Sequence, residues 1–112
     1  MDVVYKNGTV KKQCTELSQA KRDFSEKVAK KLLKLVNFLN AADNLESILN
    51  NPVLHFHALK GKLNGLYAID IDGRRGSYRL LVRFDDYPQE MVFSNSKSIE
   101  IIQVTEVSKH YE

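Results

Sequence analysis

The spacing of apolar residues changes about halfway along the 112-residue chain. Before residue 50 the apolar residues recur every three or four positions, which is the period of an amphipathic helix. From Leu66 onward they alternate with other residues, which is the period of a strand. The first half therefore predicts helices and the second half predicts a sheet.

Two helices are expected after a short edge strand at Val3-Val4-Tyr5. Asn7-Gly8 indicates a turn, and Thr9 offers a side-chain oxygen that can cap a first helix ending between residues 21 and 23. Ser25 can cap a second helix, and the two should pack as an antiparallel hairpin. The apolar positions are Val10, Cys14, Leu17 and Phe24 in or near the first helix, and Val28, Leu32, Leu35, Val36 and Leu39 in the second. The other face of the second helix carries Lys27, Lys30, Lys31 and Lys34.

A short third helix and a run of strands complete the expected elements. Asp43 and Glu46 have the spacing of a capping box, and Asn50-Asn51-Pro52 should end the helix that follows. Strands are expected at Leu66 to Ile71, Tyr78 to Phe84, Met91-Val92-Phe93 and Ile99 to Val107, with residues 72–77 as a glycine-containing hairpin loop. The order of elements predicts a single α+β domain over residues 1–112. In it, an N-terminal strand and a helical hairpin pack on one face of an antiparallel β-meander sheet, and the other face stays open.

Composition narrows the function classes. The net charge of +3 and the pI of about 9.0 permit an anionic partner without requiring one. A lone Cys14 excludes an internal disulfide, and the three histidines lack metal-ligand spacing, so no metal or cofactor is expected. Neither a signal peptide nor an apolar run of roughly 18 residues is present, so we expect a cytoplasmic protein with no membrane partner.

Basic residues are concentrated on the predicted hairpin. Arg79 and Arg83 lie on the same side of one predicted strand, where they could bind adjacent phosphates, with Leu81 exposed between them. The pattern alone is better explained by a solvated face in which an arginine pairs with Asp70 on the neighbouring strand. The other candidates for binding a polyanion are Lys60, Arg74, Arg75 and Lys109, each of which is also an ordinary surface residue.

Histidine supplies the candidate proton-transfer groups, because imidazole titrates near neutral pH. His55 and His57 alternate around Phe56, so both should face the same way, and either one could be catalytic while the other is a bystander. His110-Tyr111 follows the last strand and would bring an imidazole and a phenol to the sheet edge, unless the terminus is frayed.

The hairpin also resembles a known family. His57-Ala58-Leu59-Lys60-Gly61, then Gly65-Leu66-Tyr67-Ala68-Ile69 and Tyr78-Arg79-Leu80-Leu81-Val82, are similar to the core signature of the HigB toxins. These form the plasmid maintenance killer branch of the RelE/ParE superfamily, and the ending Val104 to Tyr111 is similar as well. The resemblance implies a RelE-like fold and a ribosome-dependent endoribonuclease that cleaves translated mRNA in the 30S decoding site. It also implies neutralisation by a HigA-like antitoxin with a helix-turn-helix domain.

The resemblance assigns roles to individual residues. The family histidine falls on His57, the arginine that binds the scissile phosphate falls on Arg79, and the C-terminal aromatic falls on Tyr111. Many HigB chains end in Asp-Tyr-His, whereas this one ends in His110-Tyr111-Glu112, which leaves open whether His57 or His110 is the acid. The two strand lysines of RelE correspond here to Ala68 and Asp70, so the RelE form of the mechanism is excluded. RNA would then be held by Lys60, Arg74, Arg75, Arg83 and Lys109.

Two other functions remain open at this stage. A ParE-type toxin poisons DNA gyrase by binding, and it needs no proton-transfer groups such as the histidines found here. A non-catalytic domain with the same fold could use Leu81 and the basic helix as a partner surface.

Overall fold

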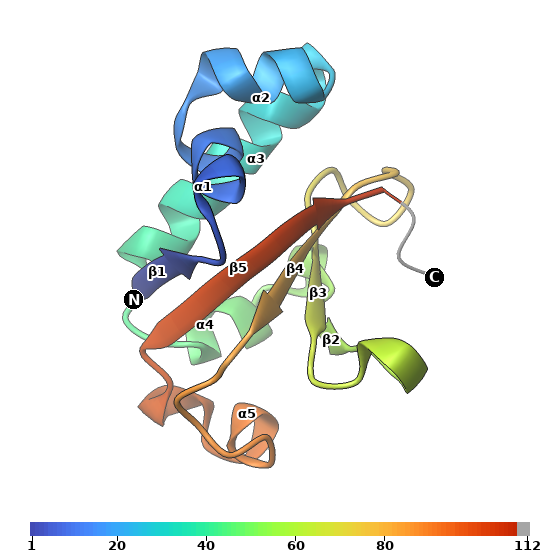
Figure 1. Cartoon of the computed structure of the whole chain (residues 1–112). Helices are drawn as coiled ribbons and strands as arrows, with labels where there is room; N and C mark the ends of the chain where they lie inside the picture. Colours follow the sequence, from blue (N-terminus) through green and yellow to red (C-terminus); the bar gives the residue numbers. More distant parts are fainter. Residues whose placement is uncertain (110–112) are drawn as a thin grey trace.

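The chain folds into one sheet flanked by helices in a computed structural model that describes residues 1–109 (Figure 1). The strands are β1 (Asp2–Tyr5), β2 (His57–Ala58), β3 (Tyr67–Asp70), β4 (Arg79–Arg83) and β5 (Ile101–Ser108). The helices are α1 (Gly8–Thr15), α2 (Leu17–Asp23), α3 (Glu26–Ala41), α4 (Glu46–Leu49) and α5 (Met91–Ser94). Short 3-10 turns are η1 (Pro52–Leu54), η2 (Gly61–Leu63) and η3 (Ser96–Ser98).

The sheet has the order β1-β5-β4-β3-β2 (Figure 1). The pairs from β2 to β5 are antiparallel, which confirms the predicted meander, and β1 is an edge strand that pairs parallel with β5. The predicted α+β class is confirmed.

Helix α3 forms where the apolar stripe predicted it. Ser25 Oγ accepts a hydrogen bond from the backbone N–H of Val28 at 3.1 Å and caps the first turn. The stripe of this helix is buried against the sheet, with Leu32 and Leu39 fully excluded from solvent. Truncating either leucine to alanine would therefore leave a core cavity and cost about 2–5 kcal/mol.

The first predicted helix is divided in two, which corrects the sequence interpretation. Glu16 adopts an extended conformation (φ −117°, ψ 111°) between α1 and α2, and this turn brings Ala20 rather than Leu17 into the core. Leu17 is 37 % exposed. The cap of α1 is Asn7, whose Oδ1 accepts from the N–H of Val10, and not Thr9.

The structure corrects two further local predictions. The short helix α4 ends at Leu49 as expected, but Asn44 Oδ1 accepts from the N–H of Glu46 in place of an Asp43 capping box. The segment predicted as a strand at Met91-Val92-Phe93 is the helix α5, in which Val92 is buried. β5 occupies the sheet position next to β4, so residues 85–100 form a helical connection at the end of the sheet and not another strand.

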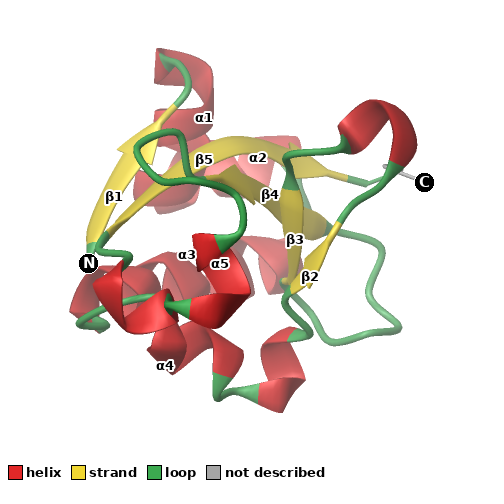
Figure 2. Cartoon of the chain, turned by 90° about the horizontal axis from the view of Figure 1, so that it is seen from below, coloured by secondary structure: helices red, strands yellow, loops and turns green. Residues whose placement is uncertain are grey.

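The second face of the sheet is partly covered and not open. Leu59, Ala68 and Leu81 are buried together there, with Leu63 and Leu66 packed against them. Figure 2 shows α3 and α4 on one side of the sheet and the helical turn after β2 on the other. Leu81 is therefore only 2 % exposed, because η2 folds the chain back over the strand on which it lies.

Candidate active site

Two histidine rings lie side by side at the start of β2. His55 ends η1 in the left-handed region (φ 45°, ψ 49°), which a non-glycine residue rarely adopts. The ring centres of His55 and His57 are 4.3 Å apart with planes inclined by 31°. Opposite His57 in the register is Ala68, which places His57 on the same face of the sheet as Asp70 and Arg79.

The backbone fixes the tautomer of His57. Its Nδ1 lies 2.8 Å from the carbonyl oxygen of His55. Because a carbonyl can only accept, Nδ1 carries the hydrogen and Nε2 carries the lone pair in the neutral ring. This is the arrangement in which Nε2 can act as a proton acceptor.

A buried ion pair lies beside the two rings. Arg79 Nε is 2.9 Å from Oδ1 of Asp70, and the Asp70 side chain has no solvent exposure. Asp70 Oδ2 is 3.8 Å from Nδ1 of His55. Within residues 1–109 neither Asp70 oxygen nor Arg79 Nε makes a hydrogen bond of good geometry, so charge holds this group together. The pairing of Asp70 with Arg79 that the sequence favoured is confirmed, but the expected solvated face is wrong, because the pair is buried.

The remaining nitrogens of Arg79 organise the hairpin loop. Nη1 donates to the carbonyls of Gly76 (2.6 Å) and Tyr78 (3.0 Å), and Nη2 donates to the carbonyl of Arg74 (2.8 Å). The loop needs glycine at two points: Gly73 has φ 69°, and a Cβ on Gly76 would lie 2.6 Å from the Asp72 oxygen. The guanidinium is thus enclosed by backbone oxygens, and its side chain is only 14 % exposed.

Four exposed cations lie on segments that adjoin the strands of the cluster formed by His55, His57, Asp70 and Arg79, which we call the histidine cluster. Arg74 and Arg75 are exposed in the loop that Arg79 holds, and Lys60 is exposed just beyond β2. Lys109 is exposed after the last strand, with Nζ 5.8 Å from the centre of the Tyr78 ring. Ser108 pairs with Arg79, so Lys109 follows the strand at the same end of the sheet.

Arg83 is not brought together with these residues. It lies at the far end of β4, four positions from Arg79 and therefore about 13 Å along the strand. Its Nε pairs with Asp85 on the surface. His110 and Tyr111, two of the predicted catalytic residues, lie outside the described residues.

His55 is the residue whose place in the site sequence reasoning missed. The alternation of His55 and His57 put both on one face, but nothing in the sequence showed that His55 would lie between His57 and the buried Asp70. Among residues 1–109 no group of three potential ligands could hold a metal ion, and no helix there is long and apolar enough to cross a membrane.

Comparison with known families decides the family of the chain. A family model described as RelE-like toxin of type II toxin-antitoxin system HigB matches residues 6–95. The chain belongs to this HigB-like toxin family. His57 and Arg79 lie inside the matched segment, whereas Lys109, His110 and Tyr111 lie beyond it.

Two solved structures share the fold of this HigB-like toxin. A chain of the YoeB-YefM complex from Staphylococcus aureus is 18 % identical, with a TM-score of 0.52 over 99 % of this chain and 98 % of that chain. The YoeB/ParE toxin from Agrobacterium tumefaciens is 14 % identical, with a TM-score of 0.53 over 99 % of this chain and 100 % of that chain. At such identities the likeness concerns the fold alone, and it confirms the RelE-like architecture. A comparison with curated proteins gave no match.

Proposed function

We propose that this HigB-like toxin is a ribosome-dependent endoribonuclease that cleaves translated mRNA without a metal ion. The observation that carries the proposal is the His57 ring, whose Nδ1 is held by a backbone carbonyl in a sheet whose adjoining segments carry exposed cations. RNA contains its own nucleophile, the 2′-hydroxyl. A protein therefore needs only to move protons and to stabilise charge on the phosphorus oxygens.

His57 is proposed to transfer a proton through Nε2. As a base it would take the proton of the 2′-hydroxyl, and the 2′-oxygen would attack phosphorus as the bond to the 5′-oxygen breaks. The 5′-oxygen must receive a proton, for which His110 remains the predicted partner, with Tyr111 stacking on a base or orienting the transfer. The roles of the two histidines can be exchanged. The products would be a 2′,3′-cyclic phosphate and a 5′-hydroxyl.

Arg79 is proposed to act in two ways. In the structure its guanidinium bonds to the backbone of the loop that presents Arg74 and Arg75. A direct bond to the scissile phosphate, as the family resemblance implies, would require Nη1 or Nη2 to exchange a carbonyl for a phosphate oxygen. Lys60, Arg74, Arg75 and Lys109 would hold neighbouring phosphates. Arg83 would reach RNA only by giving up Asp85.

We further propose that the toxin is neutralised by a HigA-like antitoxin with a helix-turn-helix domain. The family is defined by toxins of type II toxin-antitoxin systems, and one structure with the same fold is a YoeB-YefM complex. Both support a protein partner for this chain.

Purified toxin, ribosomes and a defined mRNA test the nuclease proposal. The parent should cut the message only when it is translated, and His57→Ala should lower the rate by about 10²- to 10⁴-fold. His55→Asn is the matched control, because asparagine also tolerates the left-handed conformation and leaves the carbonyl of residue 55 in place. It should lose far less activity. An intact message with the parent protein, together with inhibition of DNA gyrase in a supercoiling assay, would support a ParE-type function instead.

A further inference from the structure

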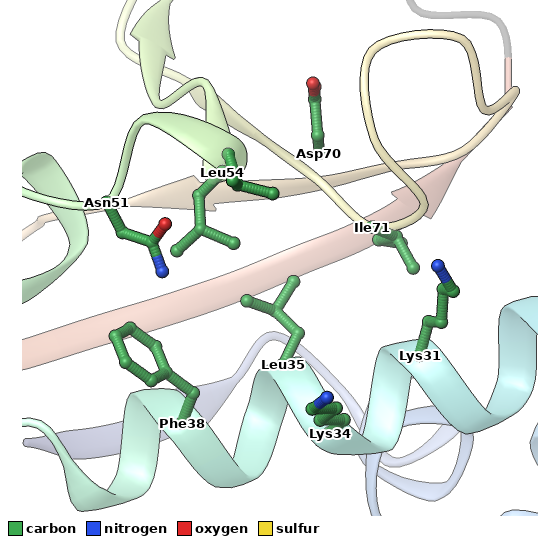
Figure 3. A pocket seen from close by; sticks show the side chains of 9 residues that line it. Lys31, Lys34, Leu35, Phe38, Asn51, Leu54, Asp70 and Ile71 are labelled. Atoms are coloured by element: carbon green, nitrogen blue, oxygen red, sulfur yellow. The ribbon is translucent and has the colours of Figure 1, made fainter.

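A groove with an apolar floor runs along the helix α3, away from the histidine cluster. Leu35 of α3, Leu54 of η1 and Ile71 line it, and it encloses about 340 Å³. Figure 3 shows Leu35, Leu54 and Ile71 directed into the space between the helix and the opposing chain. The Asp70 carboxylate points away from the helix in the same view, because Arg79 holds it on the other face of the sheet.

The rims of the groove expose apolar surface. Val53 of η1 is 72 % exposed and Phe38 of α3 is 37 % exposed, on opposite sides of the groove. Isolated apolar residues on a surface need no explanation, but two that flank an apolar floor form a continuous patch. Such a patch is typical of a site that another chain covers.

The charge of the groove is positive. Lys31 and Lys34 lie on its α3 side, and the only acidic lining residue in the described part of the chain, Asp70, is neutralised by Arg79. Lys31 shares Asp72 with Lys27, whereas Lys34 has no carboxylate within 4.0 Å among residues 1–109. An occupant that carries carboxylates would therefore complement this rim.

We propose that this groove binds an acidic, amphipathic segment of the antitoxin. Apolar side chains of that segment would fill the floor between Phe38 and Val53, and its Asp or Glu residues would pair with Lys34 and Lys31. RNA fits the groove less well, since aliphatic side chains offer no stacking surface for bases and only one aromatic ring is present. The inference rests on the proposed antitoxin partner but not on the nuclease mechanism.

The test uses the antitoxin, taken as the protein whose co-expression restores growth, and measures its affinity for the full toxin chain. Phe38→Glu should weaken binding at least about 30-fold, because it puts a charge where the proposed partner would bury an aromatic side chain. Lys34→Glu should weaken binding and reduce its dependence on salt. Leu17→Glu is the matched control, because Leu17 is also 37 % exposed but lies on α2 outside the groove.

Growth and cleavage assays separate this inference from the proposed nuclease. Phe38→Glu should remain toxic when expressed alone and should no longer be neutralised by the antitoxin, which also shows that the variant folds. Equal neutralisation of the parent and Phe38→Glu would overturn the groove proposal. A groove variant that binds the antitoxin normally but no longer binds mRNA would also overturn the groove proposal. Failure of the parent to cleave mRNA would instead count against the nuclease proposal and would leave the affinity comparison valid.

Discussion

Asp70 and Arg79 face each other across β3 and β4, with Oδ1 and Nε 2.9 Å apart and the Asp70 side chain wholly buried. This pair links the candidate catalytic histidines to the hairpin loop. On one side Asp70 lies near the ring of His55, and on the other Arg79 bonds to the loop at residues 73–78. A change in either residue should therefore affect both stability and activity.

Removing Arg79 should strongly destabilise the folded protein, because it leaves Asp70 charged and buried without its partner. Arg79→Ala is expected to lower the free energy of unfolding by about 3–5 kcal/mol. The double variant Arg79→Ala/Asp70→Ala should lose less than the sum of the two single variants. Urea denaturation measures all three. The control is Arg83→Ala on the same strand, whose pair with Asp85 is half exposed and should contribute less than about 1 kcal/mol. Equal losses at the two arginines would contradict this account.

Asp72 should make stability depend on pH in the acid range. Its hydrogen bond to Lys31, together with the charge of Lys27, holds the pKa of the Asp72 carboxyl below its ordinary value of 3.8. A carboxyl with a depressed pKa stabilises the folded state fully above the unfolded value, and this contribution is lost as the pH falls through the lower folded value. The difference in unfolding free energy between parent and Asp72→Asn should thus be constant at neutral pH and shrink below about pH 3.8. A difference that stays constant down to pH 2 would disprove the coupling.

Cys14 should be unreactive while the protein is folded. The side chain is 1 % exposed, and burial raises the pKa of its thiol from 9.0 to about 12. Only the thiolate reacts with iodoacetamide, so the raised pKa alone slows alkylation by about 1000-fold at pH 8. Alkylation followed by mass spectrometry, with and without denaturant, measures the ratio. Rapid modification of the native chain would show that α1 opens away from the sheet.

RNA binding should weaken with salt in proportion to the exposed cations around the histidine cluster. For single-stranded RNA bound to the His57→Ala chain, removing Arg74, Arg75 or Lys109 should each reduce the slope of log affinity against log salt by about 0.7. Lys97→Ala is the control, because Lys97 pairs with Glu46 in another part of the molecule. A slope that changes as much in the control would mean that binding is spread over the whole surface.

The sequence predicted a strand correctly where apolar and polar residues alternate over a long segment. In Tyr78 to Phe84 every second residue is apolar, and the strand β4 follows with Leu80 and Val82 in the core. The three-residue run Met91-Val92-Phe93 was too short to distinguish a strand from a helix, and the structure makes it α5. The burial of Leu81 could not be predicted from β4 alone, because the segment that covers Leu81 is η2, in a different part of the chain.

The candidate site was predicted only in part for a similar reason. His57 and the flanking cations follow from their positions on strands and loops. The close approach of the His55 and His57 rings depends on the left-handed turn at the end of η1, which sequence periodicity does not report. The enclosure of Arg79 depends on the path of the hairpin loop, so its four hydrogen bonds to backbone carbonyls could not be predicted from the pattern of residues.

The pairing of β1 with β5 has a consequence for how the toxin is made. Within residues 1–109 the first strand pairs only with β5, and β5 is also the neighbour of β4. During synthesis the early helices therefore have no completed sheet to cover until residues 101–108 leave the ribosome. A nascent chain should therefore stay protease-sensitive until residues 101–108 have emerged and paired with β4 and β1.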